Sequence, residues 1–247
     1  MRREALLVCS VHSDFDGWRV AGGNAHRTLA ARAAIDWAVA RSADLVVFPA
    51  GYLRARAGTP ESVREAGAEV LRLARRHRIA IVLGVDACAP EVRSPDVAIV
   101  ARGKLPFFVL AWSPDEKSVA VWRQRSTTSR DARAVSDEAS DDVRLLVVRG
   151  TNVGVVLSGE GFNAAIREAM VAAEPALAVM PAHVAGGLRH WQALGWLRDN
   201  GVPALRAVHA GDAAENVLWR GEGKESALEV ESFESNEQRL EASLFAA

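Results

Sequence analysis

Hydrophobic residues follow two different spacings along the first third of the chain, and the spacing predicts where strands and helices lie. Mainly apolar runs at 4–11, 44–48 and 79–87 predict strands that are buried on both faces. Between them, apolar residues three and four positions apart predict helices over Asn24–Arg41, with Asn24 as the N-cap, and over Pro60–His77. This part of the chain is therefore expected to alternate strands and helices.

The rest of the chain begins with short strands that have no helical period between them, at 96–101, 106–112 and 118–124, and this pattern predicts a β-meander. Residues 126–142 are polar and predict a loop. Further strands are expected at 143–148, 152–157, 177–180, 203–208, 216–220 and 227–231, with helices at 162–173 and 187–200. Together the elements predict a mixed α/β fold (α+β mixed sheets), with two layers of sheet and helices outside them, in a single domain over 1–247.

Composition and charge narrow the classes of function. Thirty basic residues balance 31 acidic ones, for a net charge of -1, so no excess of positive charge favours nucleic acid as a partner. The two cysteines, Cys9 and Cys88, lie in apolar runs without CxxC spacing, which favours a reducing compartment and buried thiols over disulfides or zinc. No signal peptide, membrane span, dinucleotide fingerprint or P-loop is recognised, so we expect a cytoplasmic protein without a cofactor.

Three segments of the chain, taken in order, carry a resemblance to a known family. ADLVVFPAGYL (Ala43–Leu53), SVAVWRQRS (Ser118–Ser126) and VGVVLSGEGF (Val153–Phe162) resemble the strand ends that bear the catalytic residues of the nitrilase superfamily of carbon–nitrogen hydrolases. The stretches that flank these segments fall where the family has similar ones, so the resemblance covers nearly the whole chain. It implies that family's four-layer α-β-β-α sandwich.

The residues at the three catalytic positions depart from the family. There, a glutamate acts as general base, a lysine stabilises the oxyanion and a cysteine attacks the substrate carbon; here the positions hold Ala50, Gln124 and Ser158. Ala50 cannot take a proton, Gln124 is a neutral donor, and Ser158 needs a neighbouring base before it can act as a nucleophile. The leading hypothesis is a catalytically degenerate protein, a pseudoenzyme that keeps the fold and binds a small molecule or a protein partner.

A second hypothesis keeps catalysis. An active amidase-like hydrolase or acyltransferase, acting on amide or nitrile substrates, would use Ser158 as nucleophile with Glu160 or His183 as base. Against it, a serine in a glycine-flanked turn is more often a turn residue than a nucleophile, and His183 is as readily a hydrogen-bonded residue at a strand end. The resemblance also implies that Tyr52 and Arg123 flank the pocket. The expected ligand-binding residues are Tyr52, Arg123, Gln124, Ser158, Glu160 and His183.

Two further features of the sequence bear on binding. His12, Asp14 and Asp16 alternate along one face if the segment is extended, but no further ligand has a fixed position, so a solvated loop is favoured over a metal site. The helix from Phe162 to Ala173 has a wide apolar face that needs a cover. In the family, helices of this region pack across a two-fold axis, so the resemblance implies a homodimer through this helix; alternatively, the helix only covers its own sheet.

Overall fold

The computed structural model describes residues 5–14, 23–87, 107–125, 143–183, 188–210, 217–221, 223–235 and 238–247. The helices are α2 (Gly23–Ala40), α3 (Pro60–His77), η1 (Ser158–Phe162), α5 (Ala164–Ala172) and α6 (Leu188–Asp199). The strands are β1 (Leu7–Asp14), β2 (Leu45–Val47), β3 (Leu53–Ala55), β4 (Ala80–Ala87), β5 (Phe107–Trp112), β6 (Ala120–Arg123), β7 (Leu145–Val148), β8 (Thr151–Val155), β9 (Leu177–Ala182), β10 (Ala204–Ala210), β11 (Val217–Arg220), β12 (Gly223–Ser226), β13 (Glu229–Ser235) and β14 (Gln238–Ala246). None of these helices is both long and apolar enough to cross a membrane.

The strands form two halves that meet at β1. The order of the main path is β6-β5-β4-β2-β1-β10-β9-β8-β7, with the β13–β14 pair added beside β1 and the β11–β12 pair beside β10. β10 pairs with β1 only at Ser13↔His209 and Asp14↔Ala210, at the very end of β1. Because strands of the two halves pair only there, the halves diverge and face each other as two layers.

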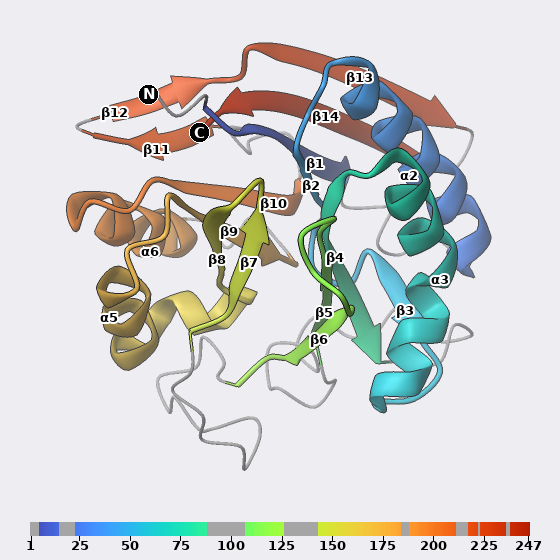
Figure 1. Cartoon of the computed structure of the whole chain (residues 1–247), viewed down its shortest axis with the longest axis horizontal. Coiled ribbons are helices and arrows are strands. Elements are labelled where there is room, and N and C mark those ends of the chain that lie inside the picture. The colour runs from blue at the N-terminus through green and yellow to red at the C-terminus, as the bar shows by residue number, and fades with distance from the viewer. Residues whose placement is uncertain are drawn as a thin grey trace.

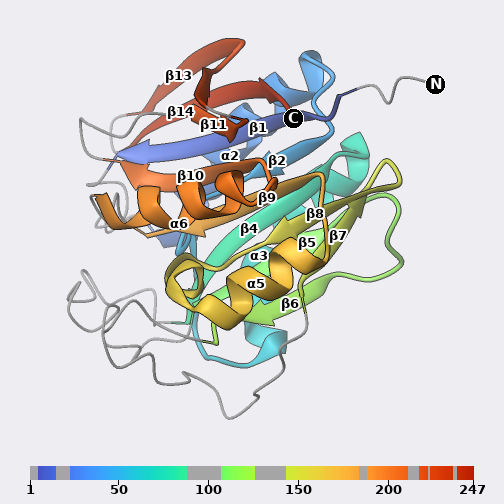
Figure 2. The ribbon, with the colours of Figure 1, turned by 90° about the vertical axis from the view of Figure 1, so that its left-hand side faces the viewer.

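Helices cover the outer face of each half (Figure 1). α2 and α3 lie on one side of the molecule, and α5 and α6 lie on the other, as the turned view also shows (Figure 2). Three buried apolar clusters fill the spaces between the layers: one beneath α2 and α3, one between the two halves of the sheet, and one beneath α5 and α6. The predicted α-β-β-α arrangement with mixed sheets is confirmed.

Local sequence signals explain where α3 begins and ends. The Thr59 side chain accepts a hydrogen bond from the Ser62 amide, Pro60 fills the first turn, and Arg78 ends the helix in the left-handed conformation. The predicted limits of this helix are confirmed. The expectation for the preceding helix is wrong at its start, because Asn24 does not cap α2; its side chain instead forms two hydrogen bonds with the backbone of Arg54.

The helix expected over 162–173 is shorter than predicted and is preceded by a separate turn. Residues 158–162 form the 3₁₀ helix η1, and Asn163 then caps α5 by accepting hydrogen bonds from the amides of Ala165 and Ile166. The buried side chains of α5 are Ile166 and Met170, and Met170 belongs to the cluster shared with the strands beneath. The apolar face of this helix is thus covered by its own sheet.

The C-terminal strand β14 is the main element that the sequence pattern does not predict. It lies antiparallel between β1 and β13. Its pairing with β1 runs from Leu7↔Ala246 to Ser13↔Leu240. The strand places Leu240, Ala242 and Leu244 in the core beneath α2 and α3. The expected strand at 96–101 and the loop at 126–142 lie outside the described residues.

Candidate functional site

The layer between the two halves of the sheet changes from apolar to polar towards one end. On a strand, every second side chain points to the same face, so His12 on β1 follows Val8 of the central cluster, and Asp86 on β4 follows Val82. The same parity places His183 after β9 and His209 on β10 at this inner face, after Val179 and Leu205 respectively. The described part of the site is therefore built at the carboxyl ends of parallel strands.

Ser158 occupies a sharp turn where β8 leads into η1. Its φ of 42° lies in the left-handed region, which residues other than glycine seldom adopt. The residue retains 8% of its surface exposed, and no group in the described residues forms a hydrogen bond with its hydroxyl. The turn presents a side chain in a strained position, as a nucleophile requires, but no described base accompanies it.

Glu160 is fully buried and its carboxylate is occupied. Oε1 accepts from the Arg125 amide at 2.6 Å, and Oε2 accepts from the Leu157 amide at 3.2 Å and from Nη1 of Arg144 at 2.5 Å. Burial lowers the pKa of Arg144, and the charge and hydrogen bond of Glu160 oppose that effect. This carboxylate fixes the turn around Ser158, and its engagement argues against a role as the base of a serine nucleophile.

Gln124 follows β6 and lies beside the same turn. Its amide N–H donates to the Phe107 carbonyl at 2.8 Å, and its side-chain Nε2 donates to the Leu157 carbonyl at 3.4 Å. The side-chain amide is therefore directed at the backbone immediately before Ser158. The structure thus brings two of the three expected positions together.

Ala50 follows β2, in the same half of the sheet as Gln124 and opposite Ser158, and it is fully buried in the central cluster. Its N–H donates to the Ala182 carbonyl at 3.3 Å, which places it beside His183. β4 passes very close to this backbone, because a Cβ on Gly84 would lie 2.5 Å from the Ala50 Cα. A side chain at position 84 would displace the segment, so a glycine is required for this approach.

His183 forms a buried pair that the sequence analysis did not include. Its Nε2 lies 2.8 Å from Oδ1 of Asp86, and its ring meets the edge of Phe107 with 4.9 Å between centroids. Asp86 is 1% exposed, whereas His183 keeps 9%. An acidic residue at the end of the otherwise apolar β4 was the signal that could have indicated this pair.

A second histidine holds the backbone at position 50. Nε2 of His209 lies 2.6 Å from the Ala50 carbonyl, which can only accept, so the ring donates there and accepts from the Ser13 hydroxyl at Nδ1. Burial, followed by the charge of Arg27, lowers the pKa of His209 well below its usual value. His209 therefore stays neutral and acts as a fixed donor.

Two expected ligand-binding residues lie elsewhere. Tyr52 is fully buried, its hydroxyl donates to the Arg27 carbonyl at 2.7 Å, and burial raises its pKa. It packs against Phe48 in the core and does not flank an opening. Arg123 is exposed at the end of β6, and its carbonyl accepts a hydrogen bond from Arg144.

The structure describes only part of the group His12, Asp14 and Asp16 that bears on metal binding. His12 is buried on β1 with Nε2 3.3 Å from the Ser10 hydroxyl, so it does not lie in a solvated loop. Asp16 and the side chain of Asp14 lie outside what the structure describes. Within the described ranges, no group of three or more His, Cys, Asp and Glu side chains could hold a metal ion.

Cys9 is buried, which raises the pKa of its thiol to about 12.

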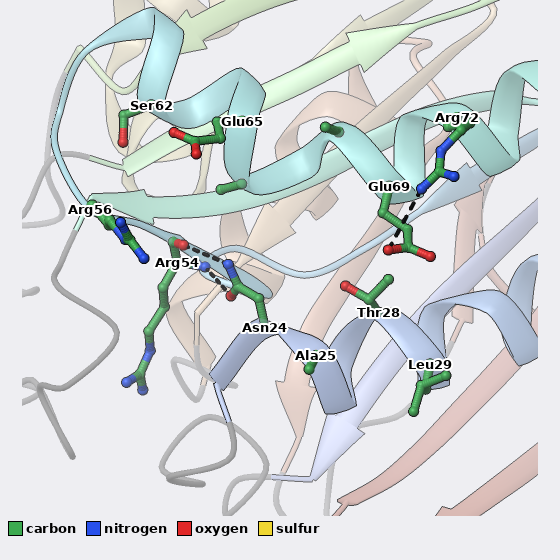
Figure 3. A pocket seen from close by; sticks show the side chains of 12 residues that line it. Asn24, Ala25, Thr28, Leu29, Arg54, Arg56, Ser62, Glu65, Glu69 and Arg72 are labelled. Carbon is green, nitrogen blue, oxygen red and sulfur yellow. Dashed lines mark hydrogen bonds and ion pairs between the residues drawn. The ribbon is translucent and has the colours of Figure 1, made fainter.

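A groove of about 760 Å³ lies on the outside of the molecule, between α2 and α3 (Figure 3). Three arginines and two glutamates line it, and of these Glu69 and Arg72 lie 3.7 Å apart and are both exposed. Arg54 and Arg56 line its other end. The groove contains none of the positions 50, 124 and 158, so it is separate from the site between the sheets.

Comparisons with known proteins agree with this geometry at the level of the fold. No family model and no curated protein matches the chain. Among solved structures, it is similar to an amidase from Nesterenkonia sp., with a TM-score of 0.67 and 14% identity over 100% of this chain and 92% of that one. A variant of that amidase in complex with butyramide gives 0.67 and 14% over 100% and 93% of the two chains. Another, with the acetamide moiety of fluoroacetamide added covalently at its active-site cysteine, gives 0.65 and 14% over 100% and 92%.

These solved structures belong to an amidase of the nitrilase superfamily. At 14% identity the likeness concerns the path of the backbone. The chain thus has the nitrilase-superfamily fold.

Proposed function

We propose that the chain is a catalytically degenerate nitrilase-like protein, a pseudoenzyme that retains the site between its sheets to bind a small molecule or a protein partner. The observation that carries the proposal is the joint identity of the three motif positions, Ala50, Gln124 and Ser158. The residue at position 50 has no proton acceptor in its side chain, and the donor at position 124 is neutral and directs one of its N–H groups at a backbone carbonyl. The amide chemistry of the structural neighbour needs both groups in working form.

The competing function, an active hydrolase or acyltransferase with Ser158 as nucleophile, requires a base at its hydroxyl. Glu160 is engaged by Arg144 and by two backbone amides. His183 pairs with Asp86, and no hydrogen bond in the described residues joins it to Ser158. The observed contacts therefore favour binding over catalysis.

Covalent labelling tests this proposal. The acetamide moiety of fluoroacetamide adds to the active-site cysteine of a variant of the Nesterenkonia amidase, which makes fluoroacetamide a suitable probe and that variant a positive control. We expect intact-mass spectrometry to show no adduct at Ser158, because an unactivated hydroxyl is a poor nucleophile. Ser158→Ala is the matched control, since an adduct that persists in this variant arises at another residue. An adduct on the parent chain that disappears in Ser158→Ala would show an active nucleophile.

We also propose a homodimer through the outer face of α5. Its exposed positions include Ala164, Ala165 and Ala172, which are small enough for a second helix to approach closely. The proposal rests on these alanines, because the larger apolar side chains of α5 pack against its own sheet. A cytoplasmic location stays a prediction from the sequence.

A further inference from the structure

Asp86 carries the one carboxylate oxygen of the site for which the described residues provide no partner. Oδ1 pairs with His183, but Oδ2 is buried without a hydrogen bond. A buried polar atom without a hydrogen bond destabilises a folded protein, so nearly all such atoms have a partner. The oxygen therefore points to a bound group that donates a hydrogen bond.

The position of Asp86 explains which site this group would enter. Ala80 and Val82 of β4 lie in the central cluster, and residues 84 and 86 continue the same face at a period of two. At Gly84 this face touches the backbone of Ala50. Asp86 thus brings a carboxylate from β4 to the surroundings of position 50, where the motif has lost its glutamate.

The described residues around this carboxylate include two acceptors. Nε2 of Gln124 donates one of its two N–H groups to the Leu157 carbonyl, its Oε1 is an acceptor, and the Ser158 hydroxyl can also accept. A lysine at position 124 would have supplied a positive charge, and the glutamine supplies none. Ser158, Gln124 and His183 retain 8%, 9% and 9% of their surface exposed, so each keeps a small contact with solvent.

The arginines nearest the site serve other partners. Arg27 donates to two carbonyls of the segment after β2, and Arg144 serves Glu160. Arg54 is the register neighbour of Asp86 on β3, but among the described residues no ion pair joins them. Asp86 is left without an arginine partner in this part of the chain. A ligand cation is therefore the group that best matches Oδ2.

We propose that this site binds a small primary ammonium compound, whose N–H groups donate to Asp86 Oδ2 and to the acceptors at Gln124 and Ser158. This inference rests on the proposed function, since it assigns a ligand class to the same site. An ammonium group offers three donors and a positive charge, whereas a carboxamide also brings a carbonyl that needs a donor. In the family, the lysine stabilises negative charge that develops on the substrate. Here position 124 holds a neutral glutamine and Asp86 adds a carboxylate, so the site favours a positively charged ligand.

Ligand-observed NMR with n-butylammonium, tetramethylammonium and butyramide tests the proposal on the intact chain. We expect saturable binding of n-butylammonium and at least about tenfold weaker binding of tetramethylammonium, which has no N–H, and of neutral butyramide. Asp86→Asn should weaken n-butylammonium binding at least about tenfold, because a hydrogen bond to a charged group is lost. Asp199→Asn, an exposed carboxylate on α6, should leave binding unchanged.

The outcomes separate the two proposals. Equal binding of the two cations, tighter binding of butyramide, or full binding by Asp86→Asn would overturn the ammonium site. If Asp86→Asn does not fold, as circular dichroism would show, the comparison of ligands on the parent chain decides alone. Appearance of butyrate in the butyramide samples would instead overturn the proposed function, whereas absence of both butyrate and n-butylammonium binding would overturn only this inference.

Discussion

Removal of the Glu160 carboxylate tests how the turn around Ser158 is held. Glu160→Ala leaves the guanidinium of Arg144, which is 8% exposed, without its partner, and removes the acceptor of two backbone amides. Breaking a buried ion pair by removing one partner costs about 3–5 kcal/mol. For a chain of this size, each kcal/mol shifts the melting temperature by about 2–4 °C, so we expect Tm to fall by about 6–20 °C.

Urea unfolding followed by circular dichroism measures this loss of stability directly. Glu168→Ala is the matched control, because Glu168 lies exposed on the neighbouring helix α5, and its removal should change the free energy of unfolding by less than about 0.5 kcal/mol. A loss below about 1 kcal/mol for Glu160→Ala would refute the reasoning. It would show that Arg144 finds another partner or water once the carboxylate is gone.

Two further predictions concern pH and assembly. The pKa of His209 is lowered in the folded chain, while the unfolded chain takes up this proton near pH 6.5, so stability is complete above that pH and declines below it. Between pH 7.5 and 5.5 the parent chain should therefore lose more stability than His209→Gln, by at most about 1.4 kcal/mol; equal pH dependence of the two chains would contradict this. For the proposed dimer, Ala165→Arg should yield monomers by light scattering while Glu168→Gln stays dimeric; an unchanged mass for Ala165→Arg would exclude this interface.

The fold could be predicted from the sequence wherever local signals determine the structure. α3 has its limits set by Thr59, Pro60 and Arg78, and the buried strands have apolar runs that suit a sheet covered on both sides. β14 could not be predicted, because it lies between β1 and β13. Its pairing with β1 joins residues that are more than 200 positions apart in the sequence. The Asn24 side chain likewise finds a tertiary partner, Arg54, in place of a local role as cap.

The site could be predicted in position but not in its contacts. The motif positions indicated where Gln124 and Ser158 lie, and the structure brings them side by side. The partners of Glu160 and His183 follow from the packing of strands that are distant in sequence, so no spacing along the chain shows that Arg144 or Asp86 will meet them. The resemblance implies that Tyr52 flanks the pocket because it lies two residues after position 50, yet its side chain is buried in the core.

Release of ammonia from butyramide measures the central claim most directly, since butyramide is bound by the Nesterenkonia amidase variant with the same fold. The assay compares the parent chain with Ser158→Ala, and uses the amidase as positive control. The account predicts that both chains release ammonia at the rate of the buffer alone, because among the described residues no base forms a hydrogen bond with the Ser158 hydroxyl. Ammonia release by the parent chain that is lost in Ser158→Ala would contradict it.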